Sequence, residues 1–292
     1  MLVVVLLLLV SAQTVVAQEN PPAEPPAPGW TTQLATLGAN SLLSGVSAGL
    51  MQYLRGGSFQ DGFTRGAMGG ALIYTGKRIA VERFDGAGLI GREVGAVGAS
   101  VVRNAADGIG SFERVVLPVG PVRLYLSTAD QFKVHPRLDL SAAAWLTYAV
   151  LEPELELHWG DSFSAGTPVF RTANKLIVQG ASNADEENDR RFHALGVAPS
   201  GLIFRSFIPA YGSKVLDRTF AHERVHVLQS DQIFLTITDP AEDWLMDRTG
   251  ATRALGQVID LNLSVQVMTA LRPLFPEYRS RPWELEASYL TR

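Results

Sequence analysis

The sequence predicts an α+β fold, and three patterns that follow one another along the chain lead to that prediction. A glycine-rich segment has helical spacing, a middle segment alternates apolar and polar residues as strands do, and the residues after about 213 are again helical in pattern. We therefore expect glycine-rich helices first, then an antiparallel sheet, and then helices up to the C-terminus.

The composition limits the classes of protein to which the chain can belong. Of its 292 residues, 47% are hydrophobic and 18% are charged, against about 25% charged in an average globular protein. This composition provides for a hydrophobic core and excludes intrinsic disorder over most of the chain. The formal net charge is −4 without any basic run, so nucleic acid is not an expected partner. The chain has no cysteine, so a metal ion must bind to His and carboxylate side chains.

The first 29 residues predict an export signal and a linker. Residues 2–10 are an unbroken apolar run that is shorter than the roughly 20 residues of a membrane span. The small residues that follow fit signal-peptide cleavage after Ala17, so we expect a periplasmic or extracellular protein. An N-terminal membrane anchor is the alternative, because no Lys or Arg precedes the apolar run. Residues 18–29 contain five prolines and predict an extended linker.

Residues 30–112 form the glycine-rich region, which we expect to be helical. Several glycines recur four positions apart, namely Gly45 and Gly49, then Gly62, Gly66 and Gly70, then Gly91 and Gly95. On a helix this spacing gives a smooth stripe that lets neighbouring backbones approach closely. Closely packed soluble helices are the first expectation, and membrane-associated helices are the alternative. The many polar side chains of residues 29–54 argue against a transmembrane span.

Residues 113–292 are expected to form a second domain of strands followed by helices. Period-two alternation at residues 122–126, 136–140 and 154–158 predicts a meandering antiparallel sheet over about 114–209. The mixed charges of residues 184–191 indicate a solvated loop within that sheet. Helical patterns then cover about 214–232, 251–274 with interruptions, and 282–290.

The residues His222-Glu223-Arg224-Val225-His226 match the HExxH pattern within a predicted helix. Positions i and i+4 share one helix face, so both imidazoles can bind a single ion, whereas Glu223 is rotated by about 100° and stays off the metal. A zinc ion there lowers the pKa of a bound water from 15.7 to about 7 and polarises a scissile carbonyl. We therefore predict Zn²⁺ as cofactor, His222 and His226 as ligands, and Glu223 as general base. The alternative is an ordinary helix with two histidines.

A catalytic zinc ion needs a third protein ligand. Metzincins have a third His six residues after the second, and Gln232 at that position excludes this class. Residues 283–287 (WELEA) follow a proline suited to a helix start and are similar to the E-x-x-A-D pattern of gluzincin zinc metallopeptidases. This resemblance implies a zincin-like fold with Glu284 as the third ligand, and Glu286 in reserve. Ser288 replaces the Asp of those families, so a carboxylate that supports a ligand histidine is missing or comes from elsewhere.

Several other residues near the motif invite an interpretation. Arg224, where an uncharged residue is usual, either points to solvent or pairs with a substrate or a neighbouring acid. Gln229 lies on the metal face but is expected to be an exposed polar residue, with a hydrogen bond to a ligand as the alternative. The strand at 202–209 is expected to form a cleft edge that binds extended peptide. Candidate donors to a tetrahedral oxyanion, with Tyr289 preferred, are His193, Tyr211, Tyr278 and Tyr289.

Together these patterns predict an exported zinc-dependent peptidase that cleaves protein or peptide substrates. The alternative is a non-catalytic envelope protein with a structural or degenerate metal site, whose glycine-rich helices contact a membrane or mediate assembly. A metallohydrolase acting on a non-peptide bond, such as a cell-wall amide, is a third hypothesis. Peripheral membrane association is compatible with each, and the sequence does not indicate an oligomeric state.

Overall fold

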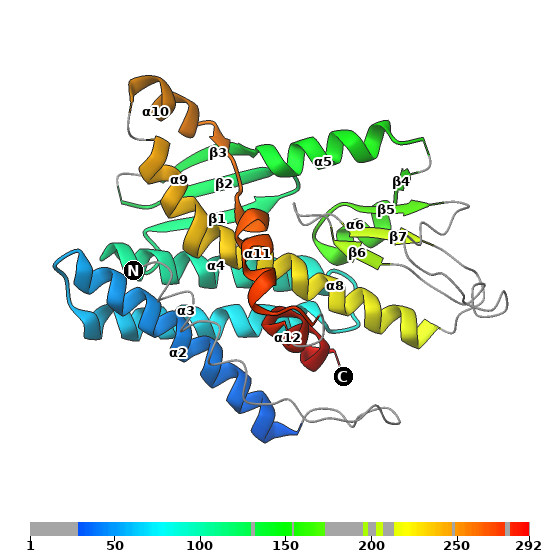
Figure 1. The fold of residues 1–292 in the computed structure, drawn as a ribbon, viewed down its shortest axis with the longest axis horizontal. Helices are drawn as coiled ribbons and strands as arrows, with labels where there is room; N and C mark the ends of the chain where they lie inside the picture. Colours follow the sequence, from blue (N-terminus) through cyan, green and yellow to red (C-terminus); the bar gives the residue numbers. More distant parts are fainter. Residues whose placement is uncertain are drawn as a thin grey trace.

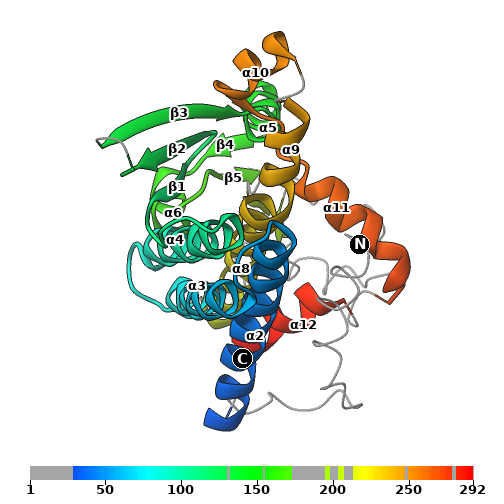
Figure 2. The ribbon, with the colours of Figure 1, turned by 90° about the vertical axis from the view of Figure 1, so that its left-hand side faces the viewer.

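The computed structural model describes residues 29–129, 132–153, 155–172, 195–197, 203–206, 213–246, 249–277 and 281–291. It has a mixed α+β architecture, in which the long helices lie together and the strands form sheets beside them, with shorter helices next to the strands (Figures 1 and 2). The α+β class is therefore confirmed. The predicted signal peptide, the linker up to residue 28 and the charged loop 184–191 lie outside the described residues, as do His193, Tyr211 and Tyr278.

The glycine-rich region forms three long helices. They are α2 (Trp30–Leu54), α3 (Phe59–Ala80) and α4 (Ala87–Asp107). The Ser58 side chain accepts a hydrogen bond from the backbone N–H of Asp61, which starts α3. Helix α4 lies between Gly86 and Gly108, whose φ angles of 85° and 74° belong to the left-handed region that favours glycine.

These helices pack backbone to backbone at their glycines. A Cβ atom on Gly76 would lie 2.5 Å from the carbonyl oxygen of Gly91, and one on Gly69 would lie 2.6 Å from that of Gly98. A Cβ on Gly70 would collide with the carbonyl oxygen of Asn40. Since such contacts leave no room for a side chain, α3 packs against both α2 and α4 only because of the glycines. The predicted close packing is confirmed.

Helix α2 is long and apolar enough to cross a membrane, which differs from the expectation based on its polar side chains. Three of those side chains, Asn40, Ser44 and Gln52, lie on its buried face together with Gly45, Ala48 and Gly49. Large apolar side chains such as Trp30, Leu34 and Leu42 are exposed instead. Length and composition alone do not distinguish a signal sequence or membrane anchor from a helix that packs on the core of a soluble protein. Export and membrane attachment therefore stay predictions.

The first sheet lies against α4. Its strands, in the order β1-β2-β3-β8, are β1 (Arg114–Val119), β2 (Val122–Ser127), β3 (Lys133–Asp139) and β8 (Ile259–Asp260). The first three form an antiparallel meander, in which Leu124 of β2 pairs with Leu117 and Pro136. Strand β8 adds to β3 in parallel, from more than a hundred residues further along the chain. The predicted meander is thus present in the first half of the strand-rich segment.

The second half of that segment differs from the prediction, because it forms a separate sheet and two helices. In the order β4-β5-β7-β6, this sheet contains β4 (Leu155–Leu157), β5 (Val169–Thr172), β7 (Ile203–Ser206) and β6 (Leu195–Val197). The helices are α5 (Leu140–Leu151) and α6 (Trp159–Ala165). The side chains of Asp139 and His158 accept hydrogen bonds from the first turns of α5 and α6 and so end the preceding strands. The single meander predicted over 114–209 is wrong.

The C-terminal part is helical, as predicted. It contains α8 (Ser213–Ile233), a π-helical turn (Phe234–Thr238), α9 (Asp239–Met246), α10 (Gly250–Gly256), α11 (Ser264–Leu271), a 3₁₀ turn (Arg272–Leu274) and α12 (Pro282–Leu290). Helix α12 begins at the predicted proline. The expected domain boundary near residue 112 falls in the loop between α4 and β1. One core cluster crosses that boundary, since Ile73 and Ala99 pack with Val116 and Phe234.

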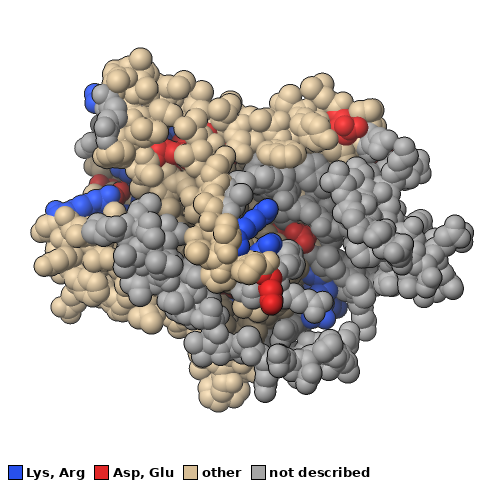
Figure 3. Space-filling model, in the orientation of Figure 1, with Lys and Arg blue, Asp and Glu red and all other residues tan. Residues whose placement is uncertain are grey.

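Buried ion pairs fix the HExxH helix to the rest of the molecule. Arg92 of α4 pairs with Asp231 of α8 at 2.6 Å, and Arg123 of β2 pairs with Asp231 at 3.3 Å and with Asp139 at 2.7 Å. The Arg123 guanidinium also lies 3.8 Å from the centre of the Phe234 ring. With so many charges inside, most of the described surface on the face drawn in Figure 3 is uncharged.

We expect a pH-dependent stability effect at Glu93 of α4. One of its carboxylate oxygens is buried without a hydrogen-bond partner among the described residues. Burial raises the pKa of Glu93 to about 7, although Arg92 opposes the increase. The folded state therefore binds a proton that the unfolded state loses above about pH 4.3, so stability falls as the pH rises from there through 7.

The substitution Glu93→Gln removes this proton linkage. In urea unfolding, its stability relative to the parent chain should be near zero at pH 4 and should rise to roughly 3 kcal/mol in favour of the variant at pH 8. A difference that does not change with pH would show that Glu93 does not titrate in this way.

Candidate metal centre

The two histidines of the HExxH pattern meet Glu284 in the structure. His222 and His226 lie one turn apart on α8, and Glu284 comes from the first turn of α12. The Oε2 atom of Glu284 is 3.3 Å from Nε2 of His222 and 3.2 Å from Nε2 of His226, and these two nitrogens are 3.1 Å apart. Among the described residues, these three side chains form a group that could hold a metal ion.

The spacing of the three atoms fits a tetrahedral ion. Ligand atoms about 2.0–2.1 Å from one tetrahedral zinc ion lie about 3.3–3.4 Å from each other. The observed separations of 3.1–3.3 Å are close to that value. Three protein ligands also leave a fourth position for water or substrate, as in catalytic sites. The donor set of two imidazoles and one carboxylate therefore suits Zn²⁺ and other divalent cations of similar preference.

The electrostatic environment between His222, His226 and Glu284 favours a positive charge. Burial lowers the pKa of His226, but the adjacent Glu284 carboxylate, together with Glu223 and Gln229, outweighs that effect, so the pKa is raised overall. Glu284 itself is only 7% exposed and lies against both rings. A carboxylate that stabilises an imidazolium here will also stabilise a cation placed between the rings.

Glu223 is next to the three ligand candidates without joining them. Burial raises the pKa of its carboxyl group, the two histidines lower it, and Glu284 raises it, with a net increase. A carboxylate with a raised pKa is a better base than an exposed one, because it holds an abstracted proton more firmly. Glu223 thus lies next to the group of three ligand candidates and is not a member of it, as the sequence predicts for a general base.

Gln229 is buried, so the expectation of an exposed polar residue is wrong. Its Oε1 atom lies 2.7 Å from Nδ1 of His226, and only 5% of the residue is exposed. The partner of this candidate ligand is thus an amide, in place of the carboxylate that Ser288 does not supply. Glu286, the reserve ligand, is 2.8 Å from the Lys77 ammonium and does not join the group of three. Burial raises the pKa of Glu286, but Lys77 reverses the effect and lowers it.

Three further expectations about this region need correction. Arg224 is only 6% exposed and lies over the ring of Phe220, so it does not point to solvent. Tyr289 lies five residues after Glu284, about 140° around α12, so the two side chains do not share a face. Strand β7 (Ile203–Ser206) is paired on both sides, and the edge strand is β6 (Leu195–Val197). The described part of the predicted edge, residues 203–206, is therefore not a free edge, and the rest of 202–209 lies outside the described residues.

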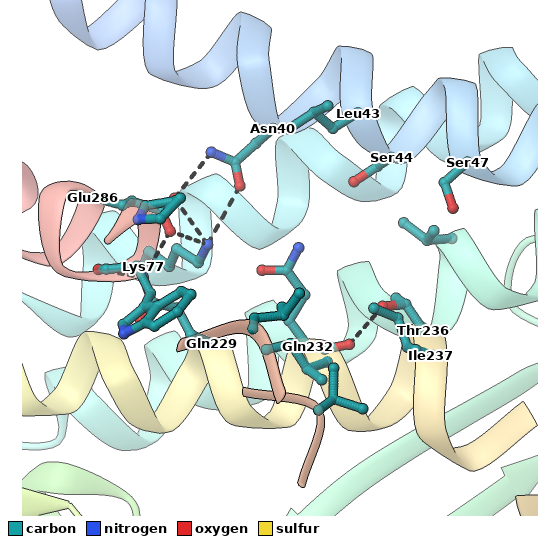
Figure 4. Close-up of a pocket in the computed structure, with 16 residues that line it drawn as sticks. Asn40, Leu43, Ser44, Ser47, Lys77, Gln229, Gln232, Thr236, Ile237 and Glu286 are labelled. Atoms are coloured by element: carbon teal, nitrogen blue, oxygen red, sulfur yellow. Dashed lines mark hydrogen bonds and ion pairs between the residues drawn. The ribbon is translucent and has the colours of Figure 1, made fainter. Parts of the chain in front are cut away.

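A cavity of about 150 Å³ adjoins the centre on the far side of Gln229 (Figure 4). Its described lining includes neither the three ligand candidates nor Glu223. Asn40, Lys77 and Glu286 lie together at one end. The sequence analysis missed the first two. The available signal for a buried ion pair was Lys77 itself, which lies in a glycine-rich helix. A charged side chain that is buried in such a helix requires a buried partner.

Comparison of the chain with protein-family models, with curated proteins and with solved structures finds no match. The function is therefore argued from the site itself.

Proposed function

We propose that this protein is a zinc-dependent peptidase with a zincin-like arrangement, in which His222, His226 and Glu284 bind Zn²⁺ and Glu223 is the general base. The observation that carries the proposal is the convergence of the three ligand atoms at separations of 3.1–3.3 Å. Glu284 comes from a separate helix, as in the gluzincin zinc peptidases that the sequence resembles. The open fourth position that three ligands leave favours a catalytic over a structural site.

In this proposal each residue has a distinct part in hydrolysis. Zinc, when bound, polarises the scissile carbonyl and lowers the pKa of water. Glu223 takes a proton from the attacking water and delivers it to the leaving amine, which balances the proton in one cycle. The Glu284 carboxylate offsets part of the positive charge of the centre and keeps both rings in place. Gln229 holds His226 through its other ring nitrogen.

The proposed substrate is a protein or peptide bound in extended form. Among the described strands, β6 (Leu195–Val197) is one edge of its sheet, and it packs beside α8, the helix that carries the motif. An edge strand offers free backbone groups to which a peptide can add as a further strand. We place the protein at the cell envelope, where the apolar helix α2 suits attachment to the membrane as well as export.

The test is a cleavage assay on the full-length chain loaded with Zn²⁺. The zinc-loaded protein is incubated with a denatured protein, and new N-termini are counted by mass spectrometry. We expect cleavage that 1,10-phenanthroline stops and added Zn²⁺ restores. Stoichiometric zinc without cleavage of any amide would overturn the proposal in favour of a non-catalytic envelope protein. Zinc-dependent cleavage of cell-wall amides alone would replace the peptidase by a different metallohydrolase.

A further inference from the structure

We propose that the glycine-rich helices support the metal centre, because Lys77 of α3 and Asn40 of α2 determine which nitrogen of His226 carries the proton and so leave Nε2 free to bind the ion. They act through Glu286 and Gln229, so all four are positioning residues. This inference rests on the proposed metal site. It gives the glycine-rich region a role in the centre that the HExxH pattern does not indicate.

The outer part of this chain of contacts fixes Glu286. The Lys77 ammonium is 2.9 Å from Oε1 and 2.8 Å from Oε2 of Glu286, and it lies 3.4 Å from the amide oxygen of Asn40 (Figure 4). The Asn40 amide nitrogen donates to Oε1 of Glu286 at 3.1 Å. Lys77 is only 1% exposed, so its charge depends on these partners. Glu286 is thereby held as a carboxylate that can only accept hydrogen bonds.

The middle part fixes the direction of the Gln229 amide. Its Nε2 atom donates to Oε2 of Glu286 at 2.9 Å and to the carbonyl oxygen of Trp283 at 3.0 Å. Both partners are acceptors without a proton, so the NH₂ group of the amide must face them. The Oε1 atom of Gln229 then faces the opposite way, toward Nδ1 of His226.

The inner part fixes the ring of His226. Because Oε1 of Gln229 can only accept, Nδ1 of His226 must carry the proton of the neutral ring. Its Nε2 atom then presents a lone pair toward His222 and Glu284, which is the form that binds a metal ion. With the amide reversed, Nδ1 would accept a hydrogen bond, and the proton would sit on Nε2, where it blocks the ion.

The glycines of α3 let Asn40 and Lys77 lie close enough to contact Glu286. Gly70 is on α3, two turns before Lys77, and a Cβ atom there would strike the backbone carbonyl of Asn40. The absence of that atom lets α2 and α3 approach until Asn40 and Lys77 share one carboxylate from α12. A continuous series of contacts therefore connects the close packing at Gly70 with the position of the proton on His226.

The test measures the tautomer of His226 and the zinc affinity of the full-length chain. In zinc-free protein, ¹⁵N NMR should find the His226 proton on Nδ1. In Glu286→Gln, whose new amide can also donate, we expect a mixture of tautomers and a roughly 10- to 100-fold weaker zinc affinity. Lys77→Met should change both in the same direction.

The double variant Gln229→Glu with Glu286→Gln should restore the Nδ1 tautomer and most of the zinc affinity. Its introduced carboxylate accepts from His226 and from the new amide, whose oxygen accepts from Lys77. Arg103→Met is the matched control, since it removes a similarly buried cation whose partners Asp239 and Asp243 lie on α9, outside this chain of contacts. An unchanged tautomer in Glu286→Gln, no rescue in the double variant, or an equal loss of affinity in the control would each overturn the inference. If the parent chain binds no zinc, the proposed function fails. The tautomers measured in zinc-free protein still show whether Lys77 and Glu286 control the proton on His226.

Discussion

Replacement of Glu223 by Gln is expected to abolish hydrolysis while zinc binding is retained. The amide keeps the shape of the side chain but cannot accept the proton of the attacking water, so we expect kcat/KM to fall about 10²- to 10⁴-fold. Glu223 is not one of the three candidate ligands, so the variant should still bind one zinc ion per chain. Both quantities are measured on the same preparation, by peptide cleavage and by elemental analysis.

The matched control is Glu82→Gln, the same change at a side chain that is 54% exposed and pairs with Arg78 on the surface. This variant should retain the parent activity. Turnover in Glu223→Gln within a few-fold of the parent chain would remove Glu223 from the reaction. Loss of zinc along with activity would mean that Glu223 is a ligand and that the assignment of Glu284 needs revision.

Removal of the Glu284 carboxylate is expected to weaken zinc binding more than substitution of residues that only support a ligand, such as Glu286 or Lys77. The substitution Glu284→Ala takes away one of three ligand atoms, so the affinity should fall by more than the roughly 10- to 100-fold typical of outer partners. It also removes the negative charge that raises the pKa of His226. Competition with a chelating dye measures the affinity, and the NMR titration of His226 should show a lower pKa.

The control for that substitution is Glu156→Ala on β4, an exposed acidic residue in another part of the molecule. Its zinc affinity should match that of the parent chain. If Glu284→Ala binds zinc as tightly as this control, then Glu284 is not a ligand.

Local patterns made the helices around the centre predictable from sequence. The i, i+4 spacing places His222 and His226 on one face whatever the rest of the fold, and Pro282 favours a helix start because it lacks a backbone donor. The start of α12 could therefore be predicted locally, whereas the contact of Glu284 with the two histidines of α8 joins residues 58 and 62 positions apart and was expected only from the resemblance to gluzincins. The meander β1 to β3 was also local, since short turns join its strands.

The remaining features depend on partners distant in sequence. Strand β8 pairs with β3, and β7 pairs in parallel with β5, and alternation within one strand indicates neither partner. Gln229 was expected at the surface because an amide on a helix is usually solvated, whereas here Glu286 and Trp283 bury it. Lys77 lies 209 residues before Glu286, and no local pattern connects them.

The account depends on one claim, that two imidazoles and the Glu284 carboxylate bind the same ion. Zinc K-edge X-ray absorption on the full-length chain with one equivalent of Zn²⁺ measures this directly. We predict two imidazole nitrogens and one carboxylate oxygen at about 2.0–2.1 Å, with one further light-atom ligand. A spectrum without imidazole scattering, or one that is unchanged in the double variant His222→Ala with His226→Ala, would contradict the account.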